Sequence, residues 1–105
     1  MNVSGQWTII QMGPGTNRFE VAVNIQPVRP DGSFVLTATH SNGTVAGGGF
    51  GSVRDGHFTI RITWTNNTEG VYSAVFDPQG FLFGSAFDVR NPTNIASWKS
   101  SKSFS

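Results

Sequence analysis

The chain has 105 residues, a formal net charge of +1 and no cysteine. That length accommodates one domain with one core, so we expect residues 1–105 to form a single unit. The missing cysteines exclude disulfides, thiolate catalysis and cysteine-type zinc sites. The seven basic residues are scattered along the chain, whereas a nucleic-acid-binding surface needs a basic stripe that neutralises phosphates. We therefore predict no nucleic-acid partner.

The hydrophobicity pattern predicts a chain that folds without spanning a membrane. No apolar run approaches the roughly 20 residues that a membrane-spanning helix needs. No charged-then-apolar leader precedes Ser4, so the sequence as written fits a cytoplasmic protein, or a secreted protein whose signal has been removed. Only 12% of the residues are charged, but 37% are hydrophobic and 12% aromatic. Placed periodically, these apolar side chains are enough to build a core.

The first three predicted strands cover residues 5–11, 18–26 and 33–40. In each of them the apolar side chains recur at every second position: Trp7 and Ile9; Phe19, Val21, Val23 and Ile25; Phe34, Leu36 and Ala38. Such alternation in β-branched and aromatic residues is typical of a strand with one buried face.

The fourth predicted strand, residues 44–53, contains the glycine-rich run 47–51. That run is compatible with a strand that bends sharply or passes close to another backbone, and equally with a flexible loop. The fifth, residues 57–65, shows the clearest alternation of the chain, with apolar Phe58, Ile60, Ile62 and Trp64 opposite Thr59, Arg61 and Thr63. The last three predicted strands cover residues 70–77, 81–89 and 95–103.

Turn signals separate these segments, at residues 13–15, 30–32, 42–43, 55–56, 66–67, 77–80 and 91–92. Asn-Gly and Asp-Gly supply the positive φ of tight hairpin turns. No segment combines helical spacing with caps, so helix content should be minor. Because every connection is short, consecutive strands should be hairpin neighbours. We predict an all-β fold, an antiparallel up-and-down meander of about eight strands closed into a barrel, since closure removes exposed edges.

The order of several motifs resembles that of the avidin/streptavidin family, a group of calycin-type barrels. Ser4-Gly-Gln-Trp7 resembles the Gly-x-Trp opening of the family, and of lipocalins more loosely. Further matching elements follow in the same order: Gly32-Ser-Phe34, Phe58-Thr-Ile with Trp64, Val71-Tyr-Ser-Ala74 and Trp98-Lys-Ser. The resemblance covers most of the chain and implies the same barrel, although function transfers less readily than fold.

The resemblance also implies which residues would surround a ligand. The aromatic walls of the family's biotin pocket fall on Trp64, Tyr72 and Trp98. The two positions that grip the ureido oxygen of biotin fall on Ile9 and Ala38, a nearby hydroxyl position falls on His40, and the seventh-strand tryptophan position falls on Asp88, or on Phe87 with a shift of one residue. The resemblance therefore implies an avidin-like barrel without biotin specificity.

Catalysis is the less favoured function, because the required groups do not form a motif. A Ser-His-Asp arrangement needs a base beside an activated hydroxyl, and neither His40 nor His57 lies in a nucleophile motif. Two histidines and six acidic residues spread along the chain do not predict a metal site,. A glycosidase pair would have to come from distant strands, such as Glu69 and Asp88. We predict no cofactor and no metal, and keep a small β-barrel enzyme as an alternative.

Aromatic and neutral polar residues together favour non-covalent binding. Small polar molecules and sugars are held by stacking against apolar surfaces and by a few placed polar groups. The candidate ligand-binding residues are Trp64, Tyr72 and Trp98 for stacking, and His40, Asn24 and Asp88 for orientation. Two classes stay open: a pocket inside the barrel for a small polar molecule, and a carbohydrate-binding lectin surface on loops such as residues 66–68.

The seventh predicted strand also bears on self-association. If its small residues and Leu82 face inward (Leu82, Gly84, Ala86 and Asp88), then Phe81, Phe83 and Phe87 face outward. Monomers seldom leave such an apolar patch in water, and a symmetric dimer or tetramer would bury it. The opposite register turns the phenylalanines inward and requires no homo-oligomer.

Overall fold

The structure, a computed structural model, describes residues 2–13, 15, 18–40 and 43–105. It contains eight strands: β1 (Gly5–Met12), β2 (Arg18–Ile25), β3 (Ser33–His40), β4 (Val45–Arg54), β5 (His57–Trp64), β6 (Glu69–Phe76), β7 (Phe81–Asp88) and β8 (Asn91–Ser103). None of the described residues is helical. In that part of the chain, no helix is long and apolar enough to cross a membrane.

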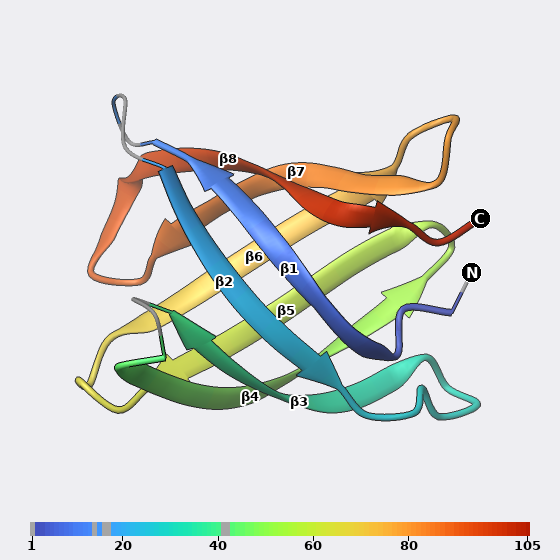
Figure 1. The fold of residues 1–105 in the computed structure, drawn as a ribbon, viewed down its shortest axis with the longest axis horizontal. Coiled ribbons are helices and arrows are strands. Elements are labelled where there is room, and N and C mark those ends of the chain that lie inside the picture. The colour runs from blue at the N-terminus through green and yellow to red at the C-terminus, as the bar shows by residue number, and fades with distance from the viewer. Residues whose placement is uncertain (1, 14, 16–17, 41–42) are drawn as a thin grey trace.

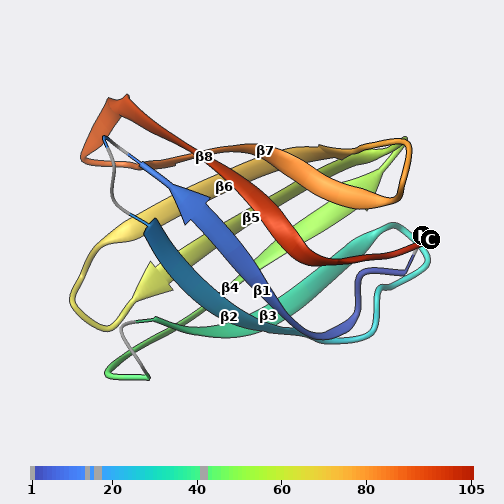
Figure 2. The same ribbon diagram turned by 45° about the horizontal axis from the view of Figure 1, so that its top comes forward.

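The strands follow one another around a closed barrel in chain order, and β8 returns to pair with β1 (Figures 1 and 2). Every neighbouring pair is antiparallel. At the seam, Ile9 lies opposite Ser100 and Gln11 lies opposite Trp98. The predicted antiparallel meander closed into a barrel is confirmed, and closure gives every strand a partner on both sides.

The alternation in the sequence sets which side chains fill the barrel. In β5, Phe58, Ile60, Ile62 and Trp64 are buried while Thr59, Arg61 and Thr63 between them are exposed. β3 repeats this pattern, and β2 does so from Val21 onward, whereas Phe19, which was predicted to share the buried face of β2, is 45% exposed. Burying one large apolar side chain contributes about 1.5–3 kcal/mol, so a one-residue slip of β5 would turn its whole stabilising face outward.

The glycine-rich run belongs to strand β4 and brings two backbones into close approach. A Cβ on Gly49 would lie 1.8 Å from the carbonyl oxygen of Arg61, and a Cβ on Gly51 would lie 2.2 Å from that of Thr59. Of the two interpretations of this run, the strand is therefore correct. Glycines at these positions let β4 bend against β5, as small barrels require at their corners.

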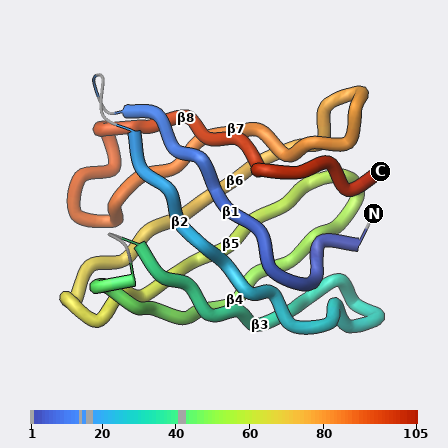
Figure 3. Tube along the Cα trace, viewed as in Figure 1, coloured from blue at the N-terminus to red at the C-terminus, as the bar shows by residue number. Residues whose placement is uncertain are grey.

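One end of the barrel is closed by aromatic side chains and lies beside both chain termini, which Figure 3 shows on the same side. Trp7 is the centre of this plug: its ring contacts Phe58, with centroids 5.9 Å apart, and Phe104, with centroids 5.1 Å apart. The Trp7 indole N–H donates a hydrogen bond to the carbonyl of Val3 at 3.0 Å. Phe34 stacks on Phe58 at 5.8 Å. We call these five side chains, Val3, Trp7, Phe34, Phe58 and Phe104, the closed end.

The connection between β7 and β8 differs from the prediction. A turn was expected at residues 91–92 and a strand from residue 95, but β8 begins at Asn91, which pairs with Asp88. The turn is instead formed by Val89 and Arg90. Pro92 is tolerated because it lies at the start of the strand, where a missing N–H costs little. The turns predicted at residues 13–15 and 42–43 lie partly outside the described residues.

The predicted register of β7 is confirmed for most of its length. Leu82 and Ala86 are buried, whereas Phe83 points outward and is 46% exposed. Phe81 is half-buried, with the Lys99 ammonium 4.5 Å from its ring centroid. The pairing of β7 with β8 is irregular between Ala86 and Asp88, where the strict alternation ends.

Candidate functional site

The end of the barrel opposite the termini contains a cavity of about 410 Å³. Its size falls within the range of small-molecule sites, roughly 300–1,000 Å³. Figure 1 shows the β5–β6 and β7–β8 turns, which contribute to its lining, on the left, away from the two termini. Its lining comes from seven of the eight strands and their turns: Gln11, Phe19, Val21, His40, Trp64, Asn66, Thr68, Glu69, Gly70, Tyr72, Ala86, Phe87, Asp88, Asn91, Asn94 and Ala96.

Three ring systems form the aromatic part of the wall. Trp64 is the last residue of β5 and lies edge to face with His40, the last residue of β3, with centroids 4.5 Å apart. Tyr72 extends over Gly70 on β6: a Cβ on Gly70 would lie 3.1 Å from Tyr72 Cε1 and 3.5 Å from its hydroxyl. The glycine therefore leaves room for the tyrosine ring to reach toward the mouth of the barrel.

Burial disfavours the charged form of both titratable rings. It raises the pKa of Tyr72 to about 12, and the nearby Asp88 carboxylate adds to this effect. Burial also lowers the pKa of His40 below its ordinary value, because the imidazolium form loses hydration,. The aromatic part of the cavity thus favours uncharged rings, and the lining contains two carboxylates and no lysine or arginine.

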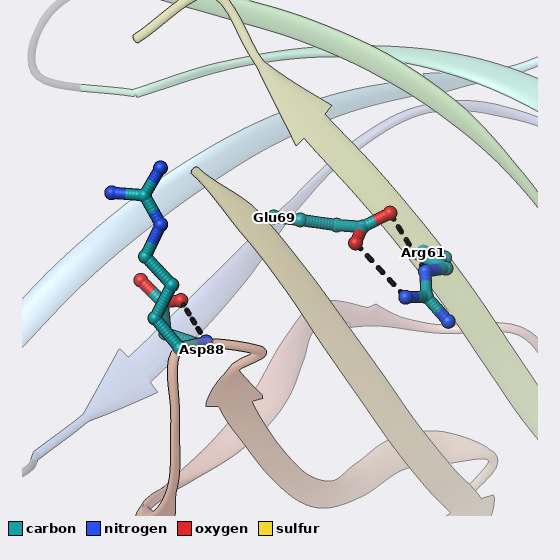
Figure 4. A network of polar contacts seen from close by, with 4 residues as sticks. Arg61, Glu69 and Asp88 are labelled. Carbon is teal, nitrogen blue, oxygen red and sulfur yellow. Dashed lines mark hydrogen bonds and ion pairs between the residues drawn. The ribbon is translucent and has the colours of Figure 1, made fainter. Parts of the chain in front are cut away.

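Those carboxylates are Glu69 and Asp88, shown with their partners in Figure 4. Glu69 forms a bidentate ion pair with Arg61, with Nε and Nη2 at 2.7 and 2.9 Å from its two oxygens. Hydrogen bonding to Arg61 lowers the pKa of Glu69. Asp88 differs, because one of its oxygens accepts the backbone N–H of Arg90 at 2.8 Å. Among the described residues the Arg61–Glu69 pair is the only salt bridge, so no described cationic side chain neutralises Asp88 by direct contact.

The rim is fixed by hydrogen bonds within and between two turns. Asn66 Oδ1 accepts from both the backbone N–H and the hydroxyl of Thr68, at 3.2 and 2.6 Å. Asn67 adopts a φ of +66°, and its carbonyl accepts a hydrogen bond from Arg90 Nη2 at 2.9 Å. The β5–β6 and β7–β8 turns are therefore joined at the mouth of the cavity.

The structure brings four of the six predicted ligand-binding residues together: His40, Trp64, Tyr72 and Asp88 all line this cavity. Trp98 lies one layer deeper, with its ring centroid 6.3 Å from that of Tyr72 and 5.8 Å from that of Phe58. Its indole N–H donates to the carbonyl of Ser85 at 3.0 Å. Asn24 lies on the other face of β2 from Val23 and lines a depression with outward residues such as Thr37. It is not part of the cavity.

Several lining residues were not singled out from the sequence, among them Gln11, Thr68, Asn91, Asn94 and Phe87. Phe87 was expected to face outward, but it is half-buried at the irregular end of β7 and contributes to the cavity. The topology offered one usable signal. In an up-and-down barrel, the ends of odd strands and the starts of even strands share one rim, so polar residues flanking those turns must gather there.

Two carboxylates, one imidazole and one phenol are the ionisable groups that line the cavity: Glu69, Asp88, His40 and Tyr72. The described residues contain no group of three or more His, Cys, Asp or Glu side chains that could hold a metal ion. One carboxylate, Glu69, is engaged by Arg61, which keeps it ionised and unsuited to act as a general acid. The cavity thus combines aromatic rings with a rim of amides and carboxylates, a composition typical of small-molecule sites,.

Comparison with known proteins reveals the fold and no family. No protein-family model matches the sequence, and no curated protein matches it. The chain is similar to the solved structure of a redesigned β-barrel, with a TM-score of 0.77, 13% identity, and 95% of this chain and 90% of that chain covered. It is also similar to a redesigned β-barrel, mFAP1, bound to DFHBI, with a TM-score of 0.70, 15% identity, and 93% and 92% covered.

Proposed function

We propose that this chain is a non-catalytic binding protein that holds a small ligand in the cavity between Trp64, Tyr72 and His40. The observation that carries the proposal is the contrast inside one barrel: aromatic side chains fill one end, while the other leaves about 410 Å³ beneath a polar rim. A hydrophobic interior tends to close such spaces, because an unfilled cavity lowers stability. A retained one at the mouth of a barrel is the usual position for a ligand.

The shape of the rim favours the interior pocket over a lectin surface on residues 66–68. In that turn Asn66 Oδ1 already accepts two hydrogen bonds from Thr68, so its acceptor capacity is largely used. The rings that would stack on a sugar, Trp64 and Tyr72, are only 7% and 5% exposed. Carbohydrate binding is therefore the second candidate, with a sugar entering the cavity rather than lying on the loop.

The avidin-like resemblance supports the same class of function with a different ligand. Ile9 is fully buried and Ala38 is 4% exposed, so the two positions implied for the ureido oxygen of biotin present hydrocarbon. Leaving that carbonyl without a partner costs about 1–3 kcal/mol for each lost hydrogen bond. mFAP1, whose barrel is similar, is bound to DFHBI, which supports the view that a barrel of this shape accommodates a small molecule.

A pair of matched variants tests the proposal. Ala86→Leu adds a side chain inside the cavity, and Ala22→Leu adds the same side chain on the outer face of β2. Nitrogen-15 NMR spectra would be recorded with small aromatic compounds, monosaccharides and biotin. We expect aromatic compounds to shift the indole N–H signal of Trp64 in the native protein and in Ala22→Leu, and not in Ala86→Leu.

Two outcomes would contradict the proposal. One is an unshifted Trp64 signal with every compound. The other is a response that Ala86→Leu leaves intact, which would place binding elsewhere. Submicromolar affinity for biotin would show that the implied roles of Ile9 and Ala38 are wrong, and a response to monosaccharides alone would favour the carbohydrate candidate.

We also infer that the chain self-associates through outward apolar side chains. Val75 and Phe83 lie opposite each other on β6 and β7, and Val35 and Phe50 do so on β3 and β4. Phe50 is 62% exposed. Cross-strand apolar pairs of this kind form patches that homo-oligomers commonly bury.

A further inference from the structure

The charges that line the cavity point to the class of ligand it selects. The ionisable groups of the lining are His40, Glu69, Tyr72 and Asp88. Arg61 and Arg90 come from the same end of the barrel, but neither contributes to the lining. A ligand in the cavity therefore meets carboxylates and neutral rings, without a lysine or arginine among the lining residues.

The two carboxylates are not equivalent. Both oxygens of Glu69 accept hydrogen bonds from the Arg61 guanidinium, so the charge of Glu69 is neutralised by Arg61. Asp88 has one oxygen on the backbone N–H of Arg90, and the Arg90 guanidinium is directed to the Asn67 carbonyl at 2.9 Å. Asp88 is thus the group best placed to accept a charged donor from a ligand.

The rings beside it favour the same kind of ligand. The faces of tryptophan and tyrosine carry negative potential and attract cations, by about 0.5–2 kcal/mol depending on hydration. Trp64, Tyr72 and Asp88 line the same cavity. An anionic ligand would meet the opposite situation, since it would lose hydration next to a carboxylate of like charge.

We propose that the cavity selects small molecules that join an aromatic or aliphatic body to a protonated amine, with the body against Trp64 and Tyr72 and the amine on Asp88. This inference rests on the proposed function and specifies its ligand class. It requires no new contact between protein groups, because Asp88 keeps its bond to the Arg90 N–H while its other oxygen accepts from the amine.

Three probes of nearly equal size and different charge test the inference: phenethylamine, 2-phenylethanol and phenylacetate. Each is titrated into the nitrogen-15-labelled protein, and the Trp64 indole N–H signal is followed. Trp7 provides an internal control, because its indole N–H is bound to the Val3 carbonyl at the closed end. We expect phenethylamine to bind about tenfold more tightly than 2-phenylethanol, as one charge-assisted hydrogen bond allows, and phenylacetate to bind most weakly.

Matched variants locate the charge effect. Asp88→Asn keeps an oxygen for the Arg90 N–H and removes the charge. Asp55→Asn removes one charge at the β4–β5 turn on the far side of the barrel, where a φ of +52° suits asparagine,. We expect Asp88→Asn to reduce the preference for phenethylamine over 2-phenylethanol to about twofold or less, and Asp55→Asn to leave that preference unchanged.

The outcomes separate this inference from the proposed function. Equal affinity for the amine and the alcohol, or a preference that survives Asp88→Asn, overturns the ligand class while the binding site stands. A Trp64 signal that none of the three probes shifts counts against the proposed function itself. The 2-phenylethanol titration shows in each variant whether the cavity remains formed, so a variant that fails to fold is recognised by losing both ligands.

Discussion

The two ends of this barrel are built from the same eight strands, but they fill their interiors differently. At the closed end Trp7 contacts Phe58 and Phe104, and its indole N–H is satisfied by the Val3 carbonyl. At the open end Trp64 and Tyr72 face a cavity of about 410 Å³. Similar aromatic side chains thus serve as a plug at one end and as a wall at the other.

What separates the ends is the availability of a further apolar layer. The chain termini supply Val3, which belongs to the core, and Phe104, which is partly buried and packs against it. The lining of the open end includes small residues, Gly70, Ala86 and Ala96, and polar residues from the turns. Under the proposed function, we expect stability to depend mainly on the closed end and binding on the open end, as is typical when function requires an imperfectly packed region.

The largest expected effect on stability comes from a substitution at the closed end. Phe58 is fully buried, and its ring contacts Trp7, Phe34 and Trp98. Phe58→Ala should lower the free energy of unfolding by about 3–5 kcal/mol. Tyr72→Phe at the open end should change it by less than about 0.5 kcal/mol, because no described residue hydrogen-bonds the tyrosine hydroxyl. Urea denaturation of both variants measures the free energies of unfolding, and a loss from Phe58→Ala no larger than that from Tyr72→Phe would contradict the role of the closed end as the main source of stability.

The next effect concerns the glycines of β4 that let the wall bend between the two ends. Gly49→Ala places a methyl group 1.8 Å from the Arg61 carbonyl oxygen, so the strands must separate. Gly48→Ala meets only the Leu36 carbonyl oxygen at 3.4 Å. We expect a loss of about 1–3 kcal/mol for Gly49→Ala and a change within about 1 kcal/mol for Gly48→Ala. Thermal unfolding of the two variants measures this difference. Equal stability would show that β4 can move away from β5 at Gly49 without cost.

Residues such as these show how far the sequence could lead. Alternation in β5 and the turn residues predicted the barrel, because a two-residue period and short connections leave few topologies. The same alternation places the Asn24 side chain on the outer face of β2, because Val23 next to it faces inward. The sequence pattern therefore already argued against Asn24 as a residue of an interior site. The depth of Trp98 was not predictable, because position along the barrel axis depends on strand tilt and on the register between β1 and β8.

The rim was also hard to predict from local pattern. Asn91 and Asn94 lie at the start of β8, where Pro92 and the irregular pairing after Ala86 hide the strand. Gln11 lies at the end of β1 between Ile10 and Met12. It continues the inward face of Trp7 and Ile9, and Asn94 likewise continues that of Ala96 and Trp98, but a polar side chain at such a position does not mark a buried face,. They become members of a site only when the closed topology brings the ends of distant strands together.

A substitution on the outward face of β7 should change the stability little and the molecular mass of the particle in solution strongly. Phe83 is 46% exposed and pairs with Val75 across β6 and β7. Phe83→Ser should dissociate an oligomer into monomers, and the folded monomer should retain its stability within about 1 kcal/mol. Light scattering with Phe50→Ser as the comparison variant identifies which apolar pair is buried. A monomeric native protein would refute self-association, and dissociation by Phe50→Ser alone would move the interface to β3 and β4.

The smallest effect concerns pH at the open end. Burial lowers the pKa of His40 below 6.5, so as the pH falls the unfolded chain binds its proton before the folded chain does. This histidine's contribution to stability is therefore lost as the pH drops through 6.5 and levels off below the folded pKa. We expect His40→Gln to reduce the decline in unfolding free energy between about pH 7.5 and about pH 5. Identical declines in both proteins would show that His40 is hydrated in the folded state.

The most direct test of the division between the two ends is to locate a bound molecule. With phenethylamine present, intermolecular nuclear Overhauser effects report which protein protons lie near the ligand ring. We predict contacts to the ring protons of Trp64 and Tyr72 and to the methyl group of Ala86, which line the open end. Contacts to Trp7 or Phe104 at the closed end, or to Phe50 on the outer wall, would contradict it.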